Sequence, residues 1–502
     1  MAVTDTATSD ALPFHEPPIT QILVHVSFLL LLNIVNHLLD ALTYCGLVGQ
    51  VLLGVFWGTP LGGLLPRTTE STVVTLGYLG LILIVYEGGL NTALRPLMQN
   101  LVLSSIVAAT GIALPIALSF LLGPLAGATS LQCFAAGAAL SATSLGTTFT
   151  ILASAGMADT RLGTVLTSAA MMDDVIGLVM IQVVASLGGS GGNVSGEAVA
   201  RPVGASVGLL IAVVIGGWGL KRTLGTVEVK GWGETLKAKV VMQTAMLLAV
   251  VTAASYAGAS VLFAAFLAGA AVGWWDDVRT RGKTGDRVSG VHVFETYYSP
   301  INRRLLAPFF FASIGFSIPI RQMFAATTVW KGLVYSLLMV LGKLATGVWL
   351  LPVSPVLTTV SQRLRELRKL GVTPAPPIPH TPQSTPTTTT TEPKSSEAAS
   401  PAIAAAEDAK PPKSLYPASI LGLAMVARGE VAFLIASVAQ SSGIFDSSEG
   451  LYLIVVWAAM VCTIAGPLGV GSLVRRVKAL EKTRADTRGN GGVSVLGVWG
   501  VS

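Results

Sequence analysis

Charged side chains are scarce in this chain: only 12% of its 502 residues are Asp, Glu, Lys or Arg. Soluble domains carry about 25% charged residues, so the low value excludes an ordinary soluble domain. Hydrophobic residues make up 52% of the chain, and the mean hydropathy is +0.69. This composition predicts a protein that crosses a membrane several times.

Cysteine and aromatic residues are also scarce. The chain has three cysteines, Cys45, Cys133 and Cys462, and each lies in an apolar run. This excludes a disulfide framework and a metal-ligand spacing. Aromatic residues make up only 7% of the chain, whereas it has 54 glycines, which predicts helices that pack closely through small residues. Residues 1–18 contain no Lys or Arg; they lack the basic region of a secretory signal and predict a polar N-terminal tail.

Long apolar runs dominate the rest of the sequence. A membrane-spanning helix needs about 20 mostly apolar residues. The runs that meet this length centre on residues 19–39, 44–65, 73–90, 100–122, 131–156, 163–187, 203–220, 237–255, 258–275, 304–322, 329–352, 416–440 and 450–473. We therefore predict an all-α polytopic membrane protein with 13 transmembrane helices, spans 1–11 within residues 19–352 and spans 12–13 within residues 416–474.

The basic residues predict the orientation of these spans. With the N-terminus outside, the inside loops and the tail hold 26 of the 32 Lys and Arg residues, as the positive-inside rule expects. Residues 371–412 contain ten of the 26 prolines and a run of threonines. We therefore predict a cytosolic Pro/Thr-rich disordered loop at residues 353–415 and a basic cytosolic tail at residues 475–502.

Two consecutive aspartates, Asp173 and Asp174, interrupt the sixth apolar run. A carboxylate in hydrocarbon costs several kcal/mol, so such residues normally face a cavity or a partner. Consecutive helix residues point about 100° apart, so both acids can border one cavity and still have different neighbours. Because two close carboxylates do not both ionise easily in a medium of low polarity, the pair predicts a site that trades protons for a cation. A structural pair capped by helix ends is the alternative interpretation.

Lys343 lies near the centre of the eleventh apolar run. A buried lysine needs a carboxylate partner or loses its charge, so we expect an ion pair with one of the two aspartates. If the partner is Asp173 and an arriving cation breaks the pair, Lys343 can release a proton. The alternative is a lysine whose side chain reaches the membrane interface.

Two other apolar runs contain a glycine among polar residues, at 141–148 and at Arg428-Gly-Glu430. Unwound backbone is tolerated at membrane depth only where it lines a protein cavity. Two broken helices in corresponding positions of two halves indicate a transporter site. The ends of half-helices carry opposite partial charges, and we expect Arg428 and Glu430 to neutralise them, with Glu430 also a candidate for a proton path.

The order and spacing of seven segments resemble the monovalent cation:proton antiporter superfamily in its sodium/hydrogen exchanger domain. These segments are residues 49–60, 79–90, 139–144, 172–177, 265–269, 308–315 and 426–431. The sequence looks closest to the family 2 branch, which contains bacterial sodium/proton antiporters and glutathione-gated potassium efflux proteins. The resemblance implies inverted repeats, spans 4–6 and 11–13, with two broken crossing helices that move against a second domain. That second domain would form a homodimer.

By this resemblance, Asp174 is the principal cation and proton carboxylate, and Asp173 is the acid that pairs with Lys343. Thr143 and Ser144 lie at the crossing and would add oxygen ligands. Members with two aspartates at this place tend to be electrogenic, so the resemblance implies an electrogenic exchange of Na⁺ or K⁺ for protons that serves pH homeostasis. The long loop departs from compact bacterial members and suggests a fungal source.

We expect a transporter in the bilayer of the plasma membrane or of an endosomal or vacuolar membrane. We expect no enzyme activity, no cofactor, no nucleic-acid partner and no metal ion beyond the transported cation at Asp174. One alternative is a K⁺ efflux protein or a channel-like cation permease, which would pass cation without obligatory proton movement. A remote alternative is an intramembrane aspartyl protease, but that class needs its two acids on different helices, one in a Gly-x-Gly-Asp sequence that this chain lacks.

Overall fold

The computed structural model describes residues 16–43, 46–92, 100–144, 152, 156–158, 160–189, 196–224, 236–280, 289–351, 415–446, 450–488 and 495–500. All regular secondary structure in these ranges is helical, and ten helical stretches are long and apolar enough to cross a membrane. The three other predicted spans fall on the shorter helices α2 (Gly46–Trp57), α7 (Ser130–Ser141) and α15 (Ala307–Phe316), so the count of thirteen stays a prediction. Apart from Leu415, the predicted loop 353–415 lies outside the described residues, as do residues 1–15 of the N-terminal tail.

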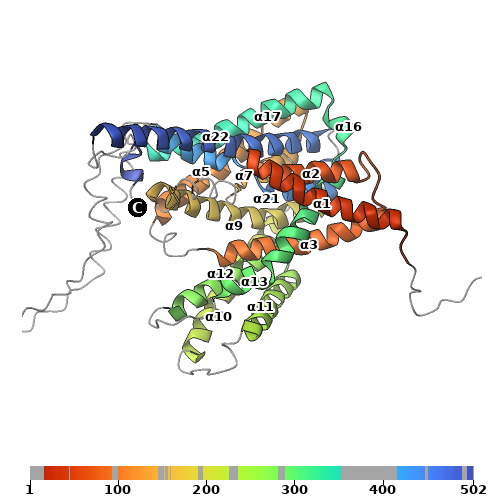
Figure 1. Ribbon diagram of the computed structural model, residues 1–502, viewed down its shortest axis with the longest axis horizontal. Helices are drawn as coiled ribbons and strands as arrows, with labels where there is room; N and C mark the ends of the chain where they lie inside the picture. The colour runs from red at the N-terminus through yellow and green to blue at the C-terminus, as the bar shows by residue number, and fades with distance from the viewer. Residues whose placement is uncertain are drawn as a thin grey trace, which may run out of the picture.

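One set of helices, here called the scaffold group, packs around α3 and α12. It consists of α1 (Ile19–Thr43), α2 (Gly46–Trp57), α3 (Arg67–Leu90), α10 (Gly196–Leu224), α11 (Leu236–Ala257), α12 (Val261–Thr280), α13 (Gly290–Tyr297), α14 (Ser299–Ile301), η1 (Asn302–Leu306) and α15 (Ala307–Phe316). In Figure 1, α10 to α13 lie together below α3.

The second set, here called the core group, consists of two units with the same order of helices. The first unit contains α5 (Leu101–Ser119), α6 (Leu122–Ala126), α7 (Ser130–Ser141) and α9 (Arg161–Gly189). The second contains α17 (Ala326–Leu344), η2 (Ala345–Leu350), α20 (Tyr416–Val426), α21 (Glu430–Ser441) and α22 (Leu451–Arg488). The short α16 (Ile320–Met323) joins the two groups. In the second unit the broken helix α20–α21 lies between α17 and α22, and in the first unit α7 lies between α5 and α9.

Glycine lets the scaffold helices touch backbone to backbone. A Cβ atom on Gly269 of α12 would lie 2.2 Å from the carbonyl oxygen of Tyr86 in α3. A Cβ atom on Gly54 of α2 would lie 2.1 Å from the carbonyl oxygen of Ala312 in α15. Small residues allow such approaches in membrane proteins, where van der Waals packing drives helix association.

The predicted break of the second unit is present, and α7 of the first unit ends where the other break is predicted. A capping box between Thr129 and Gln132 starts α7, but the helix ends at Ser141, and Ala142 has extended backbone. In the second unit, α20 ends at Val426 and α21 begins at Glu430, with extended backbone between them. Most of the chain that follows the first break, 145–151 and 153–155, lies outside the described residues.

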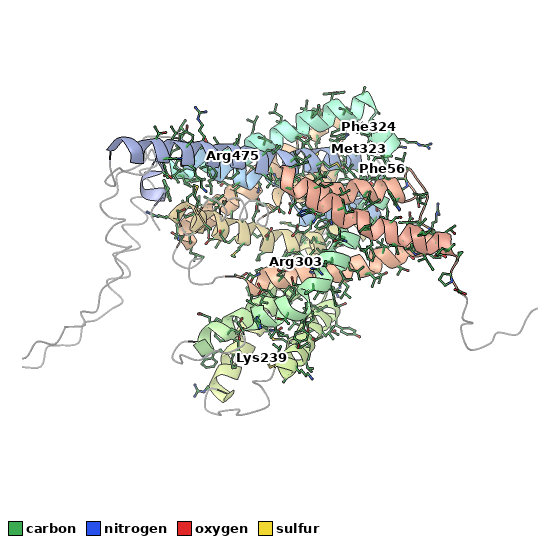
Figure 2. The ribbon with its side chains drawn as sticks, viewed as in Figure 1. Phe56, Lys239, Arg303, Met323, Phe324 and Arg475 are labelled. Atoms are coloured by element: carbon green, nitrogen blue, oxygen red, sulfur yellow. The ribbon has the colours of Figure 1, made fainter. Side chains whose placement is uncertain are left out.

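The two groups meet where α9 packs against α10 and α12, where α15 packs against α21, and at one end of the bundle. Figure 2 labels Met323 and Phe324 at that end, where α16 packs against α22. The Trp457 ring of α22 contacts Phe324 edge-on, and its Nε1 donates to the Met323 carbonyl oxygen at 2.8 Å. These contacts connect α22 of the core group with α16.

We predict that Gly269→Leu destabilises the protein by about 1–3 kcal/mol or more, because an added side chain meets backbone that has no room to move. The measurement is the melting temperature of the purified protein in detergent. Gly216→Leu is the matched control, since a Cβ atom on Gly216 of α10 meets no atom within 4 Å. Equal melting temperatures for the two variants would contradict the close α3–α12 packing.

Candidate functional site

The two broken helices touch at their breaks. The Ser144 amide donates to the Ala427 carbonyl oxygen at 2.8 Å, which joins the two units by a backbone hydrogen bond. A Cβ atom on Gly429 would lie 2.9 Å from both the Cβ and the Oγ of Ser144, so a side chain at this position would push the segments apart. We call the contact between residues 142–144 and 427–429 the crossing.

Arg428 is completely buried at the crossing. Its Nη1 donates to the carbonyl oxygens of Ser141 at 3.2 Å and Ala142 at 2.9 Å. The last carbonyls of a helix have no partner within the helix and carry a partial negative charge. The guanidinium therefore supplies both hydrogen bonds and compensating charge to the end of α7, from the opposite unit.

Glu430 is the first residue of α21 and is half-buried. An N-terminal helix end carries a partial positive charge, which favours a carboxylate there. Arg428 and Glu430 thus stand next to helix ends of opposite sign, in the places that the broken-helix interpretation gives them.

Asp173 and Lys343 form an ion pair within the core group. Lys343 Nζ lies 2.8 Å from Asp173 Oδ2, and both side chains are fully excluded from solvent. Thr143 from the crossing completes the cluster: Lys343 Nζ donates to Thr143 Oγ1 at 2.8 Å, and Thr143 Oγ1 donates to Asp173 Oδ2. The second oxygen, Asp173 Oδ1, is buried and has no hydrogen-bond partner among the described residues, so it is a free acceptor.

Two glycines make room for this cluster. A Cβ atom on Gly111 of α5 would lie 3.3 Å from Lys343 Nζ, so the ammonium group occupies space that a larger residue would fill. A Cβ atom on Gly177 of α9 would lie 3.1 Å from the side chains of Ala142 and Val431. The absence of a side chain at Gly177 brings the aspartate-bearing helix against the crossing.

Asp174 has a different environment from its neighbour. Its side chain is partly exposed, and it makes no hydrogen bond to a residue that the structure describes. The charged groups that act on it are Glu430 first, then Asp173 and Lys343. Asp174 and Glu430 are thus two half-buried carboxylates beside the crossing.

The structure brings together most of the residues that the sequence selected. Thr143, Asp173 and Lys343 form one cluster, Asp174 and Glu430 are electrostatic neighbours, and Ser144 lies against Gly429 rather than on the ion pair. The roles of these residues in binding stay predictions.

Sequence reasoning missed two supporting features. Gly111 is one glycine among many in apolar runs, and nothing in its neighbourhood indicates that it faces Lys343. The buried hydrogen bond of 2.7 Å between Ser119 of α5 and Tyr335 of α17 joins the two units. A tyrosine inside an apolar run was the available signal, because a buried phenol normally finds a hydrogen-bond partner.

Two helices broken at one place, with a buried ion pair beside them, define a secondary transporter built from discontinuous helices. The chain belongs to the sodium/hydrogen exchanger family, since the family model "Sodium/hydrogen exchanger, transmembrane" matches residues 26–476. Together with its apolar helices, this makes it an integral, multi-pass membrane protein. The branch, the double-aspartate type and the fungal source stay predictions.

The chain is similar to two curated proteins from bacteria. It is 25% identical over 301 residues to the probable Na⁺/H⁺ antiporter GerT of Bacillus cereus. This match covers 59% of this chain and 73% of the relative. The chain is 31% identical over 143 residues to the high-affinity Na⁺/H⁺ antiporter NhaS3 of Synechocystis sp.. That match spans only 28% of this chain and 31% of the relative.

Among solved structures, the chain is similar to that of the sodium proton antiporter MjNhaP1 from Methanocaldococcus jannaschii at pH 8. The TM-score is 0.59 at 16% sequence identity, over 91% of this chain and 98% of the other. At this identity the likeness shows the fold.

We predict that Lys343→Met and Asp173→Asn each destabilise the protein by about 3–5 kcal/mol, because each leaves a buried charge without its partner. The double variant should recover much of that loss. The measurement is the melting temperature of the four proteins in detergent.

The control is the pair Arg303–Glu87, with 2.6 Å between Arg303 Nη2 and Glu87 Oε1 and 66% exposure of the arginine side chain. Breaking it by Arg303→Met should cost no more than about 1 kcal/mol. A Lys343→Met variant as stable as Arg303→Met would contradict a stabilising role for the buried pair.

Proposed function

We propose that this protein is a secondary active antiporter that exchanges a monovalent cation, Na⁺ or K⁺, for protons by alternating access. The observation that carries the proposal is a buried Lys343–Asp173 pair beside the partly exposed Asp174, at the crossing of two broken helices. The names of both curated relatives, which are Na⁺/H⁺ antiporters, support Na⁺ as the first cation to test.

In this proposal Asp174 is the carboxylate that holds the cation or the proton. Hard monovalent cations prefer oxygen ligands. Thr143 at the crossing and Asp173 on α9 supply such oxygens in contact with each other, and Asp174 is the next residue of α9. Asp173 Oδ1 is a buried acceptor without a partner among the described residues, so it can receive a cation without first losing a hydrogen bond. Ser144 is a less direct candidate ligand, because its side chain lies against Gly429 rather than against the ion pair.

Lys343 would couple the cation to protons. A cation that binds Asp173 competes with the ammonium group for the same carboxylate. Once its partner is lost, a lysine at this depth is destabilised as a charged group and releases its proton. The neighbouring Glu430 acts electrostatically on Asp174 and is a second carboxylate for the proton path.

Exchange that uses protons from both the carboxylate and Lys343 moves more proton charge than cation charge. The proposal therefore includes electrogenic exchange. It also includes movement of the core group against the scaffold group, a homodimer, a role in pH homeostasis and no catalytic activity. The membrane would be the plasma membrane or an endosomal or vacuolar membrane.

The first test is Asp174→Asn in proteoliposomes that contain a pH-sensitive dye. Loss of the shared carboxylate should abolish proton movement driven by Na⁺ or K⁺ gradients. Asp277→Asn is the matched control: it makes the same change in the other consecutive aspartate pair, Asp276–Asp277 at the end of α12, and should leave exchange intact. Exchange that persists in the folded Asp174→Asn protein would overturn the proposed site.

The second test is the response of exchange to an imposed membrane potential. Electrogenic exchange should accelerate when the potential favours net charge movement, and Asp173→Asn or Lys343→Ala should weaken that response. A rate that is independent of the potential would overturn the electrogenic part. A reversal potential that follows the cation gradient alone, with no proton dependence, would instead identify a channel-like permease.

A further inference from the structure

A short segment that lies outside the apolar runs of the sequence is buried against the core group. Residues 495–500 follow α22, separated from its last residue by residues 489–494. Within this segment, η3 (Gly497–Trp499) forms one turn. Val495, Leu496 and Trp499 are 5%, 2% and 9% exposed. A stretch that the sequence assigns to a basic tail is therefore apolar and buried here.

The segment lies against the beginning of α9. The Arg161 guanidinium lies over the Trp499 ring, 5.0 Å from its centre, within the usual range of a cation–π contact. Leu162 and Leu166, on the first turns of α9, belong to the same buried apolar cluster as Leu496 and Trp499. Arg161 and the tryptophan thus lie at the opposite end of α9 from its junction with α21.

The same cluster includes residues of the second unit. Val474 and Val477 of α22, Leu350 of η2 and Ile420 of α20 are all buried in it. Figure 1 shows the end of the described chain close to the ends of α22 and α9, away from α10–α13. The segment therefore covers apolar side chains of both core units at one end and touches α9 directly.

We propose that residues 495–500 are a docked strap that fastens the start of α9 to α22 and thereby restrains the helix that carries Asp173 and Asp174. Asp173 is twelve residues along α9 from Arg161, a distance of about 18 Å in a rigid helix. A shift or tilt at the start of α9 is therefore transmitted to the two aspartates. The functional consequence rests on the proposed exchange at Asp174, whereas the docking itself does not.

Docking is tested by cysteine labelling of the purified full chain with a polar maleimide, in a Cys45→Ser background. Cys133 and Cys462 are buried and should react slowly. Leu496→Cys should label at least tenfold more slowly than Ala479→Cys, which is exposed on α22. Adding Trp499→Ala should remove that protection. Val495→Cys repeats the measurement at a second buried position, in case the loss of Leu496 itself weakens docking.

Restraint of α9 is tested by the cation concentration for half-maximal exchange in proteoliposomes. Trp499→Ala should raise it at least threefold. Trp218→Ala is the matched control, because Trp218 of α10 also has an arginine over its ring, Arg222 at 5.8 Å, but is 61% exposed. This control should leave the concentration unchanged.

The strap is overturned if Leu496→Cys and Val495→Cys label as fast as Ala479→Cys, or if Trp499→Ala exchanges like the unmodified protein. The labelling result involves no transport. Labelling therefore tests the docking independently of the assignment of Asp174, which the Asp174→Asn experiment decides.

Discussion

The rest of the site depends on one constraint: backbone polar groups that lose their helical partners at membrane depth must find others within the protein. The two breaks meet this constraint for each other. Arg428 of the second unit donates to the last carbonyls of α7, and the Ser144 amide of the first unit donates to the Ala427 carbonyl. Neither break is satisfied alone, so the crossing fixes both units in one position. That position places Thr143 on the ion pair and Glu430 near Asp174.

The two consecutive aspartates have different environments because neighbouring residues of one helix point about 100° apart. Asp173 faces the interior, where Lys343 and Thr143 bind one oxygen, whereas Asp174 stays partly exposed and has Glu430 as its strongest electrostatic neighbour. The pair therefore combines a buried acid, held by Lys343 and Thr143 through one oxygen, with a partly exposed acid. Adjacent acids still titrate as a coupled pair, so a change at either affects both.

The sequence predicts the helices well, because long apolar runs and membrane thickness leave the chain few alternatives. It also predicts the break between α20 and α21, since an unbroken membrane helix accommodates a glycine between charged residues poorly, and the end of α7, where polar residues enter the apolar run. The residues alone leave open which aspartate meets Lys343, because the answer depends on how α9 is rotated against α17; the assignment to Asp173 comes from the family resemblance, and the structure pairs these two residues. The sequence also does not reveal that Gly111 makes room for the ammonium group or that residues 495–500 are buried, because these follow from contacts between distant segments.

The glycine contacts have a consequence for where the molecule can yield. Gly54, Gly269 and Gly315 join scaffold helices, whereas Gly137, Gly347 and Gly466 join core helices. Among the described glycines, none whose Cβ atom would meet a neighbour joins one group to the other. Within each group, these close backbone contacts resist the sliding of one helix past another. The boundary along α9, α10 and α12 has no such glycine contact among the described residues, so the proposed movement of the core group against the scaffold group would not have to break one there.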